Sequence, residues 1–246
     1  CNAECTDCPR QDQYKQSIGW VDTRNVDLDV IKKGFNKKTL KNLTDISICG
    51  CFGDPLAHPD ILEVTKFFRY EHPDIRILIH TNGGLKSSTL YEKLGKVLKG
   101  SNHAIVFGID GLEDTNHVYR VNVQWKKLQK NFRSFINAGG RARWQFILFP
   151  WNMHQIDDAK QRAIDEKFTS FVAKISFAEE QGRSLQFYNT KLSSDRYIFL
   201  KNYLSFIDIF KAIIIYLIFY FKNYFLLSKK VYFSNKLNLD LQFFFK

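Results

Sequence analysis

The feature that most constrains the fold is a regular alternation of two kinds of segment between residues 44 and 177. One kind is a short run rich in Ile, Val, Phe and Leu, which is typical of a buried strand. These predicted strands span 45–51, 75–84, 103–111, 141–152 and 171–177. The other kind places apolar residues at the spacing of an amphipathic helix, at 59–73, 87–100, 123–140 and 155–168. A further helix of this kind is predicted upstream, at 27–43.

Strands that alternate with helices predict an α/β fold of parallel strands joined by crossover helices. The sheet could be an open doubly wound sheet or a full or partial barrel, because periodicity does not separate these architectures. In each of them, ligands bind at the carboxyl ends of the strands. Polar residues directly after each predicted strand are therefore the candidates for a functional site.

Composition excludes some classes of protein. The chain is 45% hydrophobic and 25% charged, so it can bury a core and global disorder is not expected. The formal net charge is +11, but the stretch 195–246 carries eight Lys or Arg and three Asp and so supplies +5 of it. The remainder is an ordinary surface charge, and we expect no nucleic-acid partner.

The character of the chain changes after residue 190. The last 52 residues hold ten of the 23 Phe and six of the 11 Tyr, and no Gly, Pro or Trp. Their uninterrupted apolar run, 212–221, is about half the length that a membrane span needs. We predict a core domain at 1–190 and a hydrophobic tail at 191–246, and we favour a non-native or unstructured tail over an amphipathic or core helix, or a membrane anchor.

Three of the five cysteines, Cys1, Cys5 and Cys8, have the spacing C-x3-C-x2-C. Thiolates are the usual ligands of iron–sulfur clusters, and three of them leave one iron of a four-iron cluster open. The alternatives are a zinc site completed by Cys49 or Cys51, or cysteines with no special role. An odd count clustered in the first quarter does not suit a secreted disulfide framework, so we expect a cytoplasmic protein.

Five segments, taken in chain order, resemble the radical S-adenosylmethionine (radical SAM) enzymes. "CNAECTDCPR" resembles their cluster loop, and "GCFGDPLAHPDI" is similar to their Gly-Gly-Glu-Pro segment, with Asp54 in place of Glu. "HTNGG" resembles a Thr-Asn-Gly turn, and "FGIDGLEDTNHVYR" resembles a Ser-Ile-Asp-Gly segment. "WQFILFPWNMHQIDDA" is similar to the fifth-strand segment of members with Cys-Pro-Arg loops. The resemblance covers about residues 1–180, and five ordered matches are far more specific than a cysteine triplet alone.

The resemblance implies a fold, two cofactors and a set of site residues. The fold is a partial (β/α)6 TIM-type barrel that lacks its first strand, which the family places before the cysteine loop. The cofactors are a 4Fe-4S cluster and S-adenosylmethionine. The implied cluster ligands are Cys1, Cys5 and Cys8. The implied cofactor-binding residues are Gly53, Asp54, Pro55, Asn82, Gly83, Asp110, Gln145 and Asn152.

The resemblance also implies the chemistry. The reduced cluster cleaves S-adenosylmethionine to methionine and a 5′-deoxyadenosyl radical, which takes a hydrogen atom from an unknown substrate, a small molecule or a peptide. A flavodoxin or ferredoxin would supply the electron. Because we interpret the chain as a fragment cut at its start, we expect it to hold a cluster weakly. The alternative function is a zinc- or cluster-binding α/β module without radical catalysis.

Two positions depart from the family pattern. Asp7 stands where an aromatic residue usually precedes the third cysteine, and Gly108 stands in place of the usual Ser. The first change leaves the adenine contacts open. The second removes a hydroxyl that could meet the ribose or the carboxylate of the cofactor.

Several of these residues also have a purely structural interpretation. Gly53, Asp54 and Pro55 are turn residues, and Asn82 with Gly83 could form a tight turn. Asp110 and Asn152 could cap the segments that follow them. Other residues near strand ends, for which we favour structural roles, are Arg120, Cys49, Cys51, His80, His117 and His154.

Overall fold

The computed structural model describes residues 1–6, 8, 10, 24–41, 43–50, 53–100, 102–149 and 151–175. The predictions made for Asp7, for Cys51 and for the tail 191–246 lie outside these residues. Within the described part of the chain, no helix is long and apolar enough to cross a membrane.

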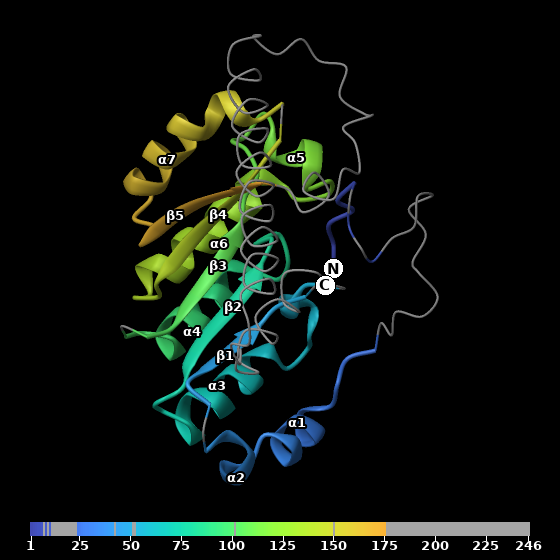
Figure 1. Cartoon of the computed structure of the whole chain (residues 1–246), viewed down its shortest axis with the longest axis vertical. Helices are drawn as coiled ribbons and strands as arrows, with labels where there is room; N and C mark the ends of the chain where they lie inside the picture. Colours follow the sequence, from blue (N-terminus) through green and yellow to red (C-terminus); the bar gives the residue numbers. More distant parts are fainter. Residues whose placement is uncertain are drawn as a thin grey trace, which may run out of the picture. The chain divides into compact units, whose positions relative to one another are not determined.

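The described residues form a five-stranded sheet, and every neighbouring pair of strands is parallel (Figure 1). The strand order β1-β2-β3-β4-β5 follows the chain. The strands are β1 (Asp45–Ile48), β2 (Arg76–Thr81), β3 (Ala104–Gly108), β4 (Ala142–Leu148) and β5 (Ser170–Ile175). Because each pair of neighbouring strands is parallel and a helix lies between successive strands along the chain, the predicted α/β fold is confirmed.

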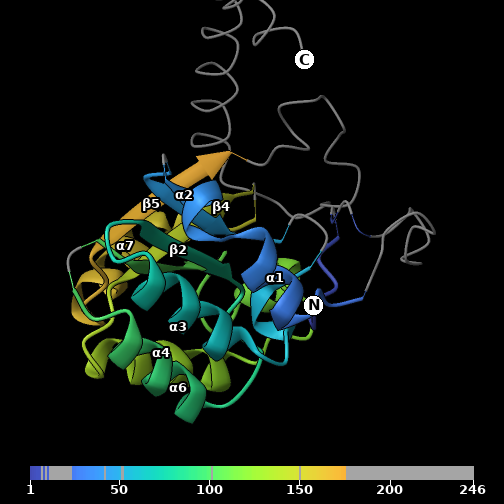
Figure 2. The same cartoon turned by 90° about the horizontal axis from the view of Figure 1, so that it is seen from below.

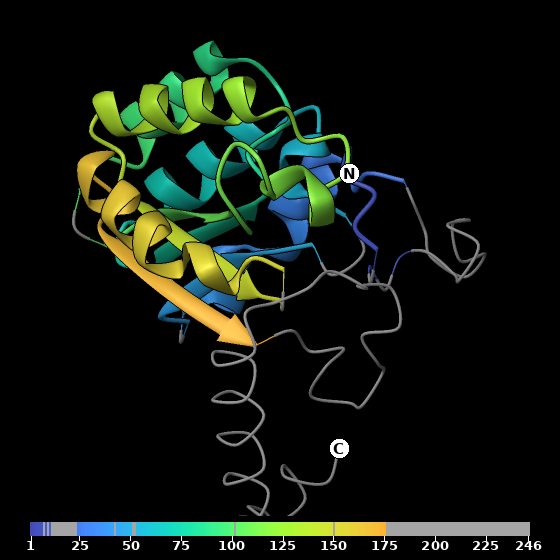
Figure 3. The same ribbon diagram turned by 90° about the horizontal axis from the view of Figure 1, so that it is seen from above.

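Four helices connect the strands and lie on one face of the sheet (Figures 2 and 3). They are α3 (Ile61–Glu71), α4 (Ser88–Val97), α6 (Trp125–Asn137) and α7 (Ile156–Asp165). Three shorter elements follow strand ends, namely η1 (Pro55–Ala57), α5 (Asn116–Tyr119) and η2 (Met153–Gln155). Successive parallel strands whose helices all lie on one face are the arrangement of a (β/α) barrel wall.

Alternate strand residues build the core beneath the helices. Ile77, Ile79, Phe107, Trp144 and Phe146 are fully buried, and they share the helix-covered face because side chains alternate along a strand. The ring of Phe107 lies 5.9 to 6.2 Å, between centroids, from four other rings, those of Tyr91, Phe132, Phe135 and Phe168. The apolar periodicity of the sequence therefore predicts the core correctly.

The segment 27–43 differs from its prediction. Instead of one helix it forms α1 (Leu28–Gly34) and α2 (Lys37–Leu40). The Asn36 side chain accepts hydrogen bonds from the backbone N–H groups of Lys38 and Thr39, at 2.9 and 3.2 Å. Asn side chains compete in this way with the continuing helix, and they cap a new one better than they extend the old one.

The other face of the sheet carries the remaining strand side chains, and we call it the open face. The register of the strands places Leu78, His80, Val106, Arg143 and Gln145 on it. These side chains are polar, charged or aliphatic, and most are half-buried. In a (β/α) barrel, this face lines the interior.

Candidate functional site at the carboxyl edge of the sheet

A cavity of about 230 Å³ lies at the carboxyl ends of the strands. Its lining comes from β2, β3 and β4, from the loops after β1 and β3, and from the cysteine loop at the chain start. The lining residues are Cys1, Cys49, Gly50, Gly53, Asp54, His80, Thr81, Asn82, Val106, Gly108, Arg120 and Gln145. The cavity lies where the alternating fold predicts a ligand.

Asp54 is buried in the wall of this cavity, and its carboxylate holds three groups of the chain. It accepts from the backbone N–H of Leu56 at 2.9 Å, and so caps η1, and from the N–H of Asn82 at 2.8 Å. The hydroxyl of Thr81 donates to it as well, at 2.9 Å. Burial raises the pKa of Asp54, and the hydrogen bonds to its charged form oppose that rise. Asp54 thus joins the loop after β1 to the end of β2.

The turn after β2 joins this wall to the cysteine loop. The Asn82 side chain donates to Oδ1 of Asn2 at 2.9 Å and to the Cys1 sulfur at 3.5 Å, while its own oxygen accepts from the N–H of Gly84. Gly83 faces away from the cavity. Its φ is +73°, and a Cβ there would lie 2.3 Å from a methyl carbon of Leu128. Only glycine suits this backbone and this close packing against α6.

The cysteine loop is held across the carboxyl edge at several points. Besides Asn82, the backbone N–H of Glu4 donates to the carbonyl of Val121 at 3.2 Å. Arg10, the Arg of the Cys-Pro-Arg sequence, folds back and donates to the carbonyls of Cys1 and Ala3, at 3.4 and 3.1 Å. The loop is therefore closed on itself by Arg10 and attached to the ends of β2 and of the segment after β3.

The three thiols of this loop have different surroundings. Cys1 is exposed and lines the cavity, Cys5 is buried, and Cys8 is half-buried. Burial raises the pKa of the Cys5 thiol, and the nearby Arg120 guanidinium opposes that rise. In the described part of the chain, no group of three or more His, Cys, Asp or Glu side chains is close enough to hold a metal ion. Of the predicted triplet, Cys1 lines the cavity, whereas Cys5 and Cys8 lie outside its lining.

Arg120 and Asp110 form a buried ion pair beside the cavity. The Nε of Arg120 lies 2.6 Å from the carboxylate of Asp110, which is completely buried, and one terminal nitrogen of Arg120 lies 3.7 Å from the Cys5 sulfur. Burial opposes the charge on Arg120, yet Asp110 and Cys5 raise the pKa of the guanidinium. Arg120 therefore keeps its charge, and it connects β3 to the cysteine loop.

The same guanidinium accounts for the glycine at position 108. A Cβ on Gly108 would lie 2.8 Å from a terminal nitrogen of Arg120. Arg120 therefore occupies the space that a serine side chain would need. The cationic fork of Arg120 stands beside the cavity in place of the hydroxyl that Gly108 lacks.

Asn152 and Gln145 were both predicted to bind the cofactor, but only Gln145 lines the cavity. The amide of Asn152 is fully buried, and it donates to the carbonyls of Asp110 and Ile147, each at 2.9 Å, and accepts from the N–H of Phe149. It ties β4 to the end of β3 and does not line the cavity. Gln145 is half-buried on β4 and does line it.

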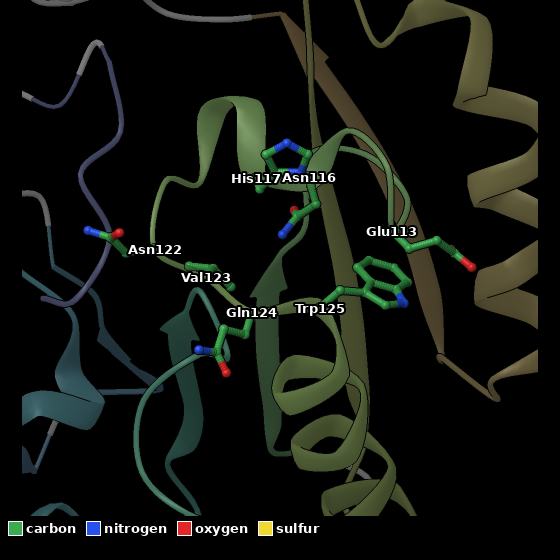
Figure 4. A pocket seen from close by; sticks show the side chains of 7 residues that line it. All are labelled: Glu113, Asn116, His117, Asn122, Val123, Gln124 and Trp125. Carbon is green, nitrogen blue, oxygen red and sulfur yellow. The ribbon is translucent and has the colours of Figure 1, made fainter.

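A second pocket, of about 270 Å³, lies in the connection between β3 and α6 (Figure 4). Its lining residues are Glu113, Asn116, His117, Asn122, Val123, Gln124 and Trp125. The Asn116 oxygen accepts from the backbone N–H of Asp110 at 2.9 Å, so the pocket shares a wall with the ion pair. It contains no thiol and none of the predicted cofactor-binding residues, and we therefore place the candidate site in the first cavity.

The cavity brings together residues from six segments of the chain. Of the predicted residues it gathers Cys1, Gly53, Asp54, Asn82 and Gln145. It leaves six others outside its lining, namely Pro55, which begins η1, the packed Gly83, the paired Asp110, the buried Asn152 and Cys5, and the half-buried Cys8.

Other lining residues were given structural roles or no role by the sequence reasoning. Thr81, the Thr of the Thr-Asn-Gly turn, donates a hydrogen bond to Asp54. Arg120 contacts the thiol of Cys5. His80 lines the cavity on β2, where it precedes Thr81. The position of each at or after a strand end was the available signal, because strand ends meet at one edge of a parallel sheet.

Comparison with known proteins identifies solved structures with a similar fold. No family model matches the chain, and no curated protein matches it. Among solved structures, the chain is similar to Streptococcus suis SuiB bound to S-adenosylmethionine, with 18% identity and a TM-score of 0.55 over 83% of this chain and 44% of that one. SuiB bound to the precursor peptide SuiA gives 18% identity and a TM-score of 0.56, over 85% and 44%.

A second similar structure is anSMEcpe with bound AdoMet and the Cp18Cys peptide, with 14% identity and a TM-score of 0.53 over 71% of this chain and 47% of that one. SuiB and anSMEcpe are radical SAM enzymes. The chain therefore has the fold of radical SAM barrels, which the five parallel strands had indicated. It spans less than half the length of these proteins.

Proposed function

We propose that this chain, which has the radical SAM fold, is the core of a radical SAM enzyme that binds S-adenosylmethionine in the carboxyl-edge cavity. The observation that carries the proposal is the attachment of the cysteine loop to the edge of that cavity. Asn82 contacts Cys1, and Arg120 contacts Cys5, so two side chains from the segments after β2 and β3 hold two of the three thiols beside one space. A cysteine triplet with only a packing role would not need this placement.

The donor set suits a 4Fe-4S cluster. Cys1, Cys5 and Cys8 offer three thiols and leave one iron without a protein ligand, and Cys1 faces the cavity. When bound, such a cluster supplies the electron that cleaves S-adenosylmethionine into methionine and a 5′-deoxyadenosyl radical, which takes hydrogen from a substrate. Burial raises the pKa of the Cys5 thiol, and the charge of Arg120 beside it opposes that rise.

The residues of the cavity are suited to hold the methionine part of S-adenosylmethionine. Asp54 lines the cavity, and its carboxylate carries the charge and the acceptor oxygens that an ammonium group needs. Gly53, next to it, leaves open space, because a Cβ there would touch nothing within 4 Å. The charged fork of Arg120 matches a carboxylate. Asn82 and Gln145 add amide groups along the wall.

The substrate is a small molecule or a peptide, and a flavodoxin or ferredoxin is the electron donor that we propose. SuiB and anSMEcpe are each seen with a peptide, which supports the peptide as one of these choices. Cys1, Cys5, Cys8 and Cys49 are free thiols, which suits the reducing cytoplasm. No nucleic acid or membrane is part of the proposal.

The test is anaerobic reconstitution of the chain with iron and sulfide, followed by dithionite and S-adenosylmethionine. We expect 5′-deoxyadenosine to form, and we expect Cys5→Ala to abolish it. Cys49→Ala is the matched control for the cluster ligands, because Cys49 lies outside the triplet, and this variant should keep the iron and sulfide content. Product formation that is equal in wild type and in Cys5→Ala would refute the proposal.

A zinc- or cluster-binding module without radical catalysis is the second candidate. The observation in its favour is that Cys49 and Cys1 line the same cavity, which allows a fourth thiol to approach the triplet. Metal analysis of the same samples separates the two. Iron and sulfide with product support the enzyme, iron without product supports a cluster module, and colourless protein with zinc that depends on Cys49 supports a zinc site.

A further inference from the structure

The open face of the sheet continues the wall of the cavity. His80, Val106, Gly108 and Gln145 line the cavity, and the strand register places them on the open face. A molecule that extends out of the cavity along the sheet would therefore meet the open-face residues next to these four. The chemistry of those residues decides what such a molecule can carry.

Two basic residues, Arg143 and Lys174, lie on the open face near the four residues that line the cavity. Arg143 lies two residues before Gln145 on β4, and its register partner on β3 is Val106, which is in turn the partner of His80. Lys174 on β5 pairs in register with Ile147, and it lies two residues beyond Val172, the partner of Gln145. Because side chains two residues apart share a face, Arg143 and Lys174 flank Gln145 on the open face.

The charges of these residues reach the cavity. Burial lowers the pKa of His80, and the charges of Lys174 and Arg143 lower it further. His80 is therefore neutral at pH 7 and can donate or accept a hydrogen bond beside the two cations. Ser170, the register partner of Arg143, adds a hydroxyl on the same face.

No carboxylate of the described residues pairs with either cation. The only acidic residue that the described strands place on the open face is Asp45, and it forms an ion pair with Arg76 at the amino ends of β1 and β2. The amino end of the face is thus neutralised, whereas the part beside the cavity keeps two positive charges. A surface that carries one sign of charge attracts ligands of the other sign.

We propose that Arg143 and Lys174, with His80 and Ser170, bind an anionic group of the substrate, a carboxylate or a phosphate. The inference rests on the proposed function, because it assigns this anion to the molecule whose hydrogen is removed in the adjoining cavity. Arg143 presents a planar fork that matches two oxygens of either group, and Lys174 adds a point charge. The anion would hold the substrate along β4 and β5 while its reacting carbon lies toward Gln145.

The experiment is calorimetric titration of the full reconstituted chain with pyrophosphate in one arm and citrate in the other. The ionic strength is held at about 0.15 M, where charges on the far surface are screened over about 8 Å. For Arg143→Gln/Lys174→Gln, we expect Kd to rise at least about tenfold, which corresponds to about 1.4 kcal/mol. A rise with pyrophosphate alone assigns a phosphate, and a rise with citrate alone assigns a carboxylate.

The matched control is Lys127→Gln/Lys130→Gln, which removes the same charge from the exposed side of α6. It should change Kd by less than about twofold, because those residues lie across the helix layer from the open face. Equal weakening in both double variants would show that the net charge of +11 attracts anions without a site, and it would overturn the proposal. Failure of wild type to bind either anion would overturn it as well.

A third variant guards against loss of folding. Arg143→Lys/Lys174→Arg keeps both charges and should keep most of the binding, with an unchanged circular dichroism spectrum. Loss as large as in the Gln variant would contradict a charge-based site. Measurement of 5′-deoxyadenosine on the same samples separates the two proposals. Cleavage without anion binding refutes only this inference, and anion binding without cleavage refutes the proposed function and leaves an anion site.

Discussion

The helix-covered face and the carboxyl edge of the sheet are both deeply buried, but they are held together by different interactions. On the helix-covered face, Phe107, Trp144 and their neighbours exclude water with apolar surface. At the carboxyl edge, Asp110 and Asn152 are also completely buried, and each is held by hydrogen bonds to the backbone of another segment.

The difference shows where this fold can support chemistry. Apolar packing tolerates no charge, because an unpaired buried charge is costly. A polar edge can bury charges only where every group has a partner, so its residues are specific and their positions are coupled. The cavity lies beside that edge, and its wall is built from the same hydrogen-bonded groups.

The largest effect is expected on the helix-covered face. Phe107→Ala removes a fully buried ring among four others and should lower the free energy of unfolding by about 3–5 kcal/mol. Val172→Ala is the matched control on the open face, where 45% of Val172 is exposed, and it should cost less than about 1 kcal/mol. Urea unfolding measures both. Equal losses would contradict the assignment of the core to one face.

The carboxyl edge is tested by its ion pair. Arg120→Met should lower the free energy of unfolding by about 3 kcal/mol, because it leaves the buried carboxylate of Asp110 without its partner. Arg133→Met, which breaks the half-exposed pair with Glu166, should cost about 0.5 kcal/mol. Thermal and urea unfolding of the two variants give the comparison. A cost at Arg120 no larger than at Arg133 would show that the edge is not a dry, coupled network.

Substitution of Gly83 tests the contact between the carboxyl edge and α6. Gly83→Ala should destabilise the chain by about 2 kcal/mol, because φ is +73° and the added methyl would overlap Leu128. Gly34→Ala, at the end of α1 with open space around it, should instead stabilise by up to about 0.5–1 kcal/mol. The opposite signs are read from urea midpoints, and destabilisation by both substitutions would argue against the packing described for Gly83.

The smallest effect is a dependence on pH in the helix layer. The hydrogen bond from Arg133 lowers the pKa of Glu166 below its ordinary value of 4.5. A lowered folded-state pKa contributes stability above the unfolded-state pKa, and this is lost as the pH falls through the folded-state pKa. Because Arg133 is half-exposed, Glu166→Gln should cost about 0.5 kcal/mol at pH 7 and less near pH 3.

Urea titrations at the two pH values measure this change. Gly34→Ala, which changes no titratable group, is the control, and its effect should be the same at the two pH values. A cost of Glu166→Gln that grows toward low pH would reverse the sign that the ion pair requires.

Several features of the site were within reach of the sequence, and others were not. The strands and the cysteine loop follow from local patterns, whereas the order of the strands in the sheet does not. Asp54 and Asn82 were found because each follows a strand. The break at Asn36 was missed because helical periodicity hides a capping side chain. The pairing of Asp110 with Arg120 was missed as well, because the two partners are ten positions apart and the intervening chain folds back through the short helix α5.

The sequence by itself determined the alternation of strands and helices, the face of each helix that is buried, and the thiol spacing, because these depend on residues that are neighbours along the chain. Tertiary structure decided which strand ends share the cavity, that Arg120 takes the space beside Gly108, and that Arg143 and Lys174 lie on the open face. These outcomes depend on the register between strands that lie far apart in sequence, and packing of the whole sheet sets that register.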